Sequence, residues 1–386
     1  MRRKSICFVL VSLLILSLAA IHTFGKKPVK PDPTPADPAI SFNADVTVRK
    51  NLFRSDLWVM NADGEAKTLL RKGPEYTDRF SHKGYYHPSF SPFGDKLVVG
   101  FVNPGTRCTG SEIRAMELSI ENNIPAVARE WTLVDCISSL SELGVDEAYL
   151  PCWSPDGTRI AFSTGKQICV APFKDTTLAP ADIEVIYDVT VDEDPTEGVH
   201  VNVYFPTWNP SSSKIAFMRQ ENQPEPGRRC HQGILLANLD PTKGCPIVEL
   251  MPPGIYSGCQ PTWSNRSEDL IAFLGPLEDS NERTQIRLMT FQVWCNPDDS
   301  YDVSKEIESL NPIERVLDVS WLPDDLGMVI SGYIEWPNRI FEVKFGNPPE
   351  IKELITPPKR NNEQYLYPNR RRCDGNVITD PSFCNP

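Results

Sequence analysis

Leu150-Pro151-Cys152-Trp153-Ser154-Pro155-Asp156-Gly157-Thr158-Arg159-Ile160-Ala161-Phe162-Ser163 is a segment that predicts a β-hairpin. Pro155 suits the second position of a turn, the Asp156 carboxylate can bond back to the backbone, and Gly157 tolerates a positive φ. Trp153 before the turn and the Ile-Ala-Phe run after it are strand formers, with the bulk to pack between two sheets. We therefore expect two antiparallel strands joined by a tight turn.

The same pattern recurs along the chain at nearly regular intervals. Each copy has an aromatic anchor, a turn cluster and a short apolar run, and the anchors are Phe90, Trp153, Trp208, Trp263 and Trp321, the last in a looser copy. The anchors are 63, 55, 55 and 58 residues apart. A second strand pair follows each hairpin. Two hairpins every ~58 residues match one four-stranded propeller blade, whereas solenoid repeats are shorter.

The repeat length predicts an all-β fold, a six-bladed β-propeller of four-stranded antiparallel blades. Ile40-Ser41-Phe42 looks like the second strand of a blade whose first strand is missing. Pairing of the amino- and carboxyl-terminal strands would close the ring and remove the free edges. Tyr365-Leu366-Tyr367-Pro368 could supply the missing strand, although Arg370, Arg371 and Arg372 stand where its aromatic anchor belongs. A tail outside the propeller is the alternative.

These residues resemble the TolB-type (WD-like) β-propeller repeat. Residues 151–163 are similar to its Trp-Ser-Pro-Asp-Gly hairpin, and residues 57–64 are similar to the strand that follows it. The resemblance covers roughly residues 40–345. It implies the propeller fold, and it implies little about function, because such blades occur in periplasmic transport-linked proteins, peptidase accessory domains and metal-dependent lyases.

The amino terminus predicts export. Arg2, Arg3 and Lys4 precede an apolar run, which is the order of a secretory signal. Whether that signal is cleaved or remains as an anchor stays open, and an uncleaved segment 6–24 would tether the chain to a membrane. The expected parts of the chain are a signal peptide or uncleaved anchor (1–25), a Pro-rich spacer (26–38), the TolB-like β-propeller (39–375) and a cysteine-containing tail (376–386).

Cysteine usage agrees with an oxidising compartment. Of the 11 cysteines, all but Cys7 follow the apolar run, and an even number in an exported chain suggests disulfides. No Cys-x-x-Cys pair occurs, which disfavours a zinc ribbon. The one local pair that the spacing suggests is Cys373 with Cys384, which would pin the tail. We expect an extracytoplasmic location: periplasmic, secreted or surface-anchored.

The net charge and the absence of common catalytic motifs exclude several classes of function. The formal net charge of −12 speaks against nucleic-acid binding. The sequence has no Gly-x-Ser-x-Gly elbow, no His-Glu-x-x-His helix and no phosphate loop. We therefore predict a non-catalytic, exported propeller that binds a protein or glycan partner on one face.

The residue before each repeat proline is the candidate binding position. Innermost strands of a propeller begin at the channel mouth, so His87, Gln260 and Asp318 could surround one opening together with Leu150 and Phe205. Imidazole, amide and carboxylate groups can bind a divalent metal ion. The alternative function is thus a metal-dependent, polysaccharide lyase-like enzyme with its site around His87. A polar, water-filled channel mouth is the plainer interpretation, and we predict no cofactor.

Overall fold

The computed structural model describes residues 37–49, 52–77, 83–102, 110–190, 200–222, 231–240, 245–252, 259–277, 280–296, 300–310, 315–333, 338–346, 348–356 and 364–370. The chain divides into Met1–Pro35 and Ala36–Pro386, and every described residue belongs to the second unit. The predicted signal peptide or anchor, the tail 376–386 and the predicted Cys373–Cys384 pair lie outside the described residues. In the described part, no helix has the length and apolar character that crossing a bilayer requires.

The regular secondary structure of the described residues consists of β-strands and one 3-10 helix at Pro180–Asp182. The strands are β1 (Ile40–Arg49), β2 (Leu52–Met60), β3 (Thr68–Arg71), β4 (Gly84–Phe90), β5 (Lys96–Val102), β6 (Glu112–Glu121), β7 (Ile124–Val134), β8 (Tyr149–Trp153), β9 (Arg159–Ser163), β10 (Gln167–Pro172), β11 (Glu184–Asp188), β12 (His200–Trp208), β13 (Lys214–Asn222), β14 (His231–Asn238), β15 (Ile247–Met251), β16 (Cys259–Trp263), β17 (Leu270–Leu277), β18 (Ser280–Cys295), β19 (Tyr301–Leu310), β20 (Arg315–Trp321), β21 (Gly327–Tyr333), β22 (Arg339–Lys344), β23 (Glu350–Ile355) and β24 (Gln364–Arg370).

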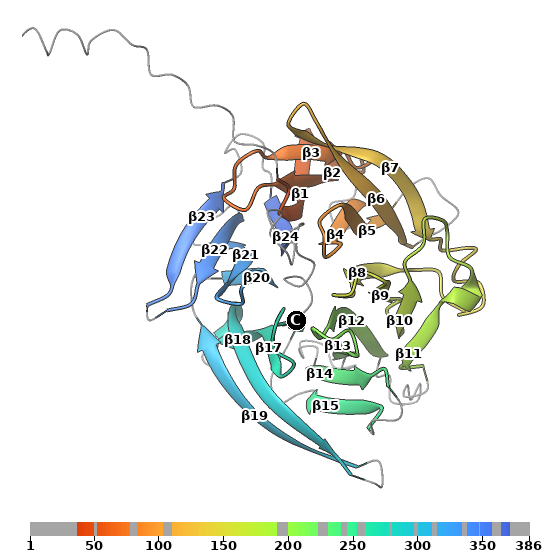
Figure 1. Cartoon of the computed structure of the whole chain (residues 1–386), viewed down its shortest axis with the longest axis vertical. Coiled ribbons are helices and arrows are strands. Elements are labelled where there is room, and N and C mark those ends of the chain that lie inside the picture. The colour runs from red at the N-terminus through yellow and green to blue at the C-terminus, as the bar shows by residue number, and fades with distance from the viewer. Residues whose placement is uncertain are drawn as a thin grey trace, which may run out of the picture. The chain divides into compact units, whose positions relative to one another are not determined.

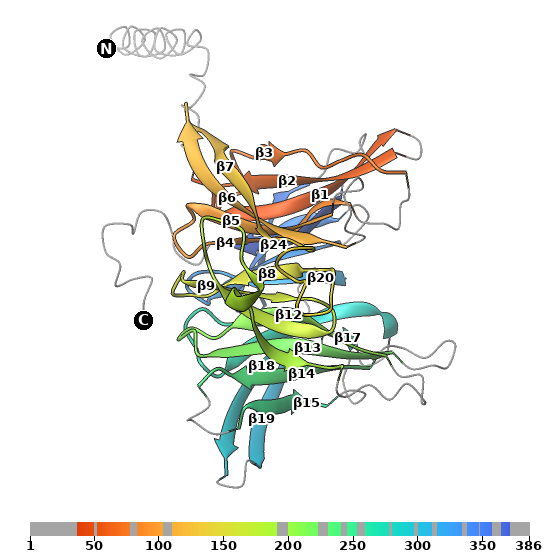
Figure 2. The same ribbon diagram turned by 90° about the vertical axis from the view of Figure 1, so that its right-hand side faces the viewer.

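Strands β8 to β23 form four-stranded antiparallel sheets, as predicted, whereas the remaining strands share one larger sheet. Four sheets contain β8–β11, β12–β15, β16–β19 and β20–β23, each with neighbouring strands consecutive in the chain. An eight-stranded sheet joins β24, β1, β2 and β3 to β4–β7 through a parallel bridge between Ser55 and Gly84. Figure 1 shows the sheets set around a common centre with β4, β8, β12 and β20 toward it. Figure 2 shows strands such as β1, β2 and β13 running roughly along the axis of that arrangement.

The turn predicted from the repeat forms as expected. Gly157 has a φ of 72°, and its N–H donates to the Ser154 carbonyl at 2.9 Å. The Asp156 carboxylate accepts hydrogen bonds from the Thr158 N–H (2.9 Å) and the Ser154 hydroxyl (2.6 Å). Proline, carboxylate and glycine thus have the roles that the sequence assigned to them.

A two-residue bulge interrupts the innermost strands at the residue pair that ends in the repeat proline. The register skips His87-Pro88 in β4, Leu150-Pro151 in β8, Phe205-Pro206 in β12 and Gln260-Pro261 in β16. The residue before each of these prolines has a φ of 48°, 57°, 55° and 51°, respectively. A left-handed conformation is unfavourable for a residue with a side chain, and more so before proline. The fold therefore holds four strained bulges at equivalent positions, and bulges re-aim the side chains they carry.

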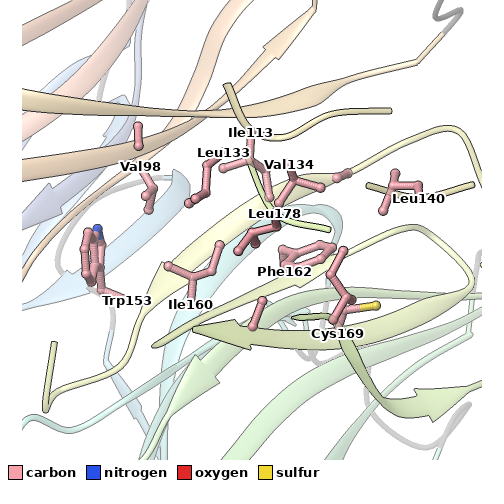
Figure 3. Packing of buried hydrophobic residues seen from close by; sticks show 14 residues of the cluster. Val98, Ile113, Leu133, Val134, Leu140, Trp153, Ile160, Phe162, Cys169 and Leu178 are labelled. Carbon is pink, nitrogen blue, oxygen red and sulfur yellow. The ribbon is translucent and has the colours of Figure 1, made fainter. Parts of the chain in front are cut away.

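The aromatic anchors are buried, and the four tryptophans among them pack between neighbouring sheets. Phe90, Trp153, Trp208, Trp263 and Trp321 are 4, 3, 0, 1 and 3% exposed. Figure 3 shows Trp153 in a cluster with Val98 and Leu133 of the preceding sheet and with Ile160 and Phe162 of its own sheet. The Trp208 indole N–H also donates to the Cys152 carbonyl at 3.2 Å, and the Trp321 indole N–H donates to the Thr262 carbonyl at 3.0 Å. The four tryptophan anchors thus fix their sheets to the one before, whereas Phe90 packs within the eight-stranded sheet.

The carboxyl-terminal strand β24 pairs antiparallel with β1. Asn369 lies opposite Ser41 and Leu366 lies opposite Asn43, so that the register skips Tyr367 and Pro368. This bulge has the same form as the four described above. A further hydrophobic cluster joins β1 and β2 to the sheet β20–β23, and its buried residues are Ile40, Phe42, Ala44, Val46, Met60, Leu322, Val329 and Ile340.

Cysteine pairing follows the prediction only in part. Cys245 and Cys295 form a disulfide across a separation of 50 residues, and Cys136 is also disulfide-bonded. Cys169, in contrast, is a free thiol that is fully buried in β10, where burial raises its pKa to about 12. The even cysteine count is therefore wrong as a guide to Cys169, because this residue serves as a small apolar member of the core.

Candidate functional site

The three candidate residues His87, Gln260 and Asp318 lie on the wall of one cavity of about 130 Å³. Strands β4, β8, β12, β16, β20 and β24 all contribute to it, since its other lining residues are Pro88, Ser89, Leu150, Pro151, Cys152, Phe205, Pro206, Thr207, Pro261, Thr262, Val319 and Pro368. The structure thus brings together the positions that the repeat register had placed around one opening.

Two of the three candidate side chains, Gln260 and Asp318, form hydrogen bonds that do not suit a divalent ion. With its amide nitrogen facing the two acceptors, Gln260 donates to the Leu317 carbonyl (2.7 Å) and to Asp318 Oδ1 (3.2 Å). The Ser331 hydroxyl donates to Asp318 Oδ2 at 2.9 Å. A hard cation needs carboxylate and amide oxygens turned toward it. Among the described residues, no group of three or more His, Cys, Asp or Glu could hold a metal ion, so the predicted metal at His87 has no support in this arrangement.

A larger cavity of about 470 Å³ adjoins the small one and shares His87, Leu150, Phe205 and Gln260 with it. Part of its wall is aromatic, formed by Tyr86, Tyr149, Tyr204, His87 and Phe205. The rings of Tyr149 and Tyr204 stack with their centroids 5.9 Å apart and their planes at 28°. The Tyr86 ring meets the His87 ring edge-on at 5.8 Å. Such an array offers broad apolar faces together with phenol hydroxyls.

Two glycines make room for the tyrosines. A Cβ at Gly100 would clash with the Tyr86 ring, and a Cβ at Gly165 would clash with the Tyr149 hydroxyl. Burial raises the pKa of both the Tyr86 and the Tyr149 phenols above the ordinary value. Both groups therefore stay neutral at physiological pH, so that each can donate as well as accept a hydrogen bond.

The remaining wall is polar and mostly uncharged. Asn43, Ser55, Gln220 and Gln232 line it, together with the ion-forming residues Asp45 and Lys83 and the apolar Met218. Gln220 and Gln232 are direct partners across the β13–β14 pair. Asn43 is 1% exposed, and its Nδ2 donates to the Ser55 hydroxyl at 3.2 Å. No group in the described part of the chain bonds to Asn43 Oδ1.

The tyrosines were not among the residues singled out in the sequence, although a signal for them exists. Tyr86, Tyr149 and Tyr204 each stand one residue before a candidate position, in three copies of a Tyr-x-Pro pattern. Because the bulge begins directly after them, they lie at the same height of three neighbouring strands. Asn43 carries no such signal, since its place in the wall depends on the pairing of β1 with β2 and β24.

Comparisons with known proteins agree with this fold. No protein-family model and no curated protein matches the sequence. The solved structure of TolB from Acinetobacter baumannii is similar, with a TM-score of 0.52 at 13% identity, over 87% of this chain and 67% of that chain. A candidate TolB from Agrobacterium tumefaciens has a TM-score of 0.47 at 13% identity, over 83% and 89% of the two chains. The β-propeller domain of Cps50 (Swd1) from Myceliophteria thermophila has a TM-score of 0.41 at 11% identity, over 80% and 84%.

The chain therefore resembles TolB-type β-propellers, as its repeat predicted. At such low identity, the similarity is evidence for the fold and not for the function.

Proposed function

We propose that the chain is a closed, six-bladed β-propeller. The eight-stranded sheet would then count as two blades that meet at the single bridge between Ser55 and Gly84. The pairing of β24 with β1 and the contacts of β24 with β4 and β20 support this proposal. So does the small cavity, to which six strands contribute equivalent residues. Closure in this way leaves no innermost strand missing.

We further propose that the protein works outside the cytoplasm. The charged and then apolar order of residues 2–21 supports export, whether residues 1–25 are removed or stay as an anchor. The Cys245–Cys295 disulfide supports an oxidising compartment, where such bonds persist.

The function that the site supports best is non-catalytic binding of a protein or glycan partner at the mouth of the central cavity. The observation that carries this proposal is the 470 Å³ cavity. Its tyrosines, amides and single histidine come from seven different strands. Ligand pockets have this size and this mixture of aromatic faces with a few polar groups. No observation favours the alternative, a metal-dependent polysaccharide lyase: of its candidate metal ligands, Gln260 and Asp318 are hydrogen-bonded to each other.

A thermal-unfolding screen tests the binding function. The purified protein is heated with single compounds from a mixed set of sugars, amino acids, short peptides and inorganic anions. A compound that binds the folded state stabilises it, by about 2.7 kcal/mol at 100 times its Kd. We expect at least one compound to raise Tm of the wild type but not of Tyr204→Ala, which removes a cavity ring.

The matched control is Tyr301→Ala, because Tyr301 lies on β19 away from the cavity lining. This variant should keep the full ligand-induced shift. A set in which no compound stabilises the wild type, or in which Tyr204→Ala responds as strongly as the wild type, would contradict the proposed function.

A further inference from the structure

The lining of the larger cavity indicates which chemical class of ligand it takes. Resting on the proposed function, we propose that the larger cavity binds a neutral disaccharide. The volume of about 470 Å³ suits a ligand of that size, whereas the adjoining cavity of about 130 Å³ is much smaller. The sugar would therefore stop at the four residues that both cavities share.

The charge of the wall argues against an ionic ligand. Asp45 and Lys83 are the carboxylate and the ammonium group among the lining residues, so their formal charges cancel. The phenols of Tyr86 and Tyr149 are protonated at neutral pH, since the ordinary pKa of tyrosine is 10.0 and burial raises it further. Recognition of an anion would call for a cluster of Arg or Lys, and recognition of a cation would call for several carboxylates. This cavity has neither.

The polar groups of the wall match hydroxyls. Gln220, Gln232 and Gln260 carry amides, each of which can donate and accept, and a sugar hydroxyl also does both. The unpartnered Asn43 Oδ1 is a buried acceptor in the same wall, and buried acceptors in native proteins nearly always have a hydrogen-bond partner. A ligand hydroxyl that donates to this oxygen would satisfy it, while Ser55 holds the other end of the amide.

The aromatic wall matches the other side of a sugar ring. A pyranose has C–H groups on its faces and hydroxyls on its edge, so it packs a face against an aromatic ring while the edge forms hydrogen bonds. The stacked pair of Tyr149 and Tyr204 provides such faces, next to the amides of Gln220 and Gln232. Phenol hydroxyls at the rim of the rings add neutral donors. Aromatic faces, paired amides and an orphan carbonyl thus surround one space.

Isothermal titration of the full chain tests this inference with four neutral disaccharides: cellobiose, maltose, lactose and N,N′-diacetylchitobiose, each up to 10 mM. We expect at least one of them to bind with Kd below 1 mM. Tyr204→Ala and Gln232→Ala should each raise that Kd at least tenfold, which corresponds to 1.4 kcal/mol. The matched controls Tyr301→Ala and Gln292→Ala change the same residue types on β19 and β18, outside the cavity lining, and should stay within twofold of the wild type.

Asn43→Ala removes the orphan carbonyl together with the amide nitrogen that donates to Ser55, and it should weaken binding by a similar factor. Its unfolding temperature shows whether it folds, and Gln232→Ala carries the test if it does not. Absence of binding by all four disaccharides, or unchanged Kd in both Tyr204→Ala and Gln232→Ala, would overturn the saccharide inference.

Triglycine and inorganic phosphate are titrated in parallel. They distinguish a failure of the saccharide inference from a failure of the proposed binding function. Binding of either probe that depends on Tyr204, with no disaccharide bound, would leave the binding function standing and overturn the sugar. If the mixed thermal screen also finds no ligand, the proposed function falls as well.

Discussion

Trp208→Ala should destabilise the protein strongly, because this indole joins two neighbouring sheets. Trp208 is 0% exposed in a cluster that includes Ala161, Ile168 and Val170 of the preceding sheet, and its N–H donates to the Cys152 carbonyl. Removing a buried tryptophan side chain costs about 3–5 kcal/mol, since the cavity that remains fills only in part. With an unfolding entropy of ~2.1 cal/mol/K for each of roughly 330 residues, 4 kcal/mol corresponds to a fall in Tm of about 6 °C.

The assay is thermal unfolding followed by circular dichroism, with urea unfolding to obtain the free energy. Trp294→Ala is the matched control, because Trp294 is 51% exposed on β18. Its expected cost is below about 1 kcal/mol, in the range of surface substitutions. If Trp208→Ala melted within 1 °C of the wild type, or if both substitutions cost the same, the indole would not join the sheets as described.

Three further predictions concern the disulfide and two titrating groups. Replacing both Cys245 and Cys295 by serine should lower the free energy of unfolding by about 2–4 kcal/mol, because the bridge closes a loop of 50 residues; equal urea midpoints of the two proteins would refute this. Burial, followed by the charge of Glu130, raises the pKa of Tyr85 to about 12. The protonated phenol therefore contributes fully to the free energy of unfolding below pH 10, and this contribution is lost as pH rises toward 12. Melting curves from pH 9 to 12 should show this loss, reduced in Tyr85→Phe, and a flat profile would contradict it. Burial alone would raise the pKa of Glu130, but hydrogen bonds from two arginines hold it below its usual value. The Glu130 carboxylate therefore contributes to the free energy of unfolding above its unfolded-state pKa near 4.5, and this contribution is lost as pH falls through the lower folded-state pKa. Glu130→Gln should be less stable at pH 7, and its stability should fall less in acid. Identical stability profiles of the two proteins in acid would exclude this role.

Local chemistry explains why so much of the fold could be predicted from the sequence. The turn at Ser154-Pro155-Asp156-Gly157 depends on residues that are neighbours in the chain, so its conformation could be predicted from composition. The burial of the anchors followed from the same repeat, because a bulky residue at a fixed place in every blade needs a neighbouring sheet to cover it. The equivalent positions of His87, Gln260 and Asp318 in the repeat predicted that they surround one opening, and all three line one cavity.

Other features depend on contacts between distant parts of the chain, and these could not be predicted. The place of Asn43, with its orphan oxygen, in the cavity wall depends on the pairing of β1 with β2 on one side and β24 on the other. The hydrogen bond of Gln260 to Asp318 joins strands β16 and β20 of two different sheets, so it could not be predicted from either residue alone. The even number of cysteines predicted a partner for Cys169. A count does not show which thiols the core encloses, so the free, buried state of Cys169 could not be predicted.

Hydrogen–deuterium exchange of the backbone amides in residues 364–370 tests the closed ring most directly. If β24 completes the first blade, these amides should exchange slowly, on the timescale of their partners in β1 and together with the amides of β2. Truncation after residue 363 should then accelerate exchange in β1 as well. Rapid exchange throughout residues 364–370 in a protein whose β1 and β2 amides are protected would mean that the carboxyl-terminal strand does not close the ring.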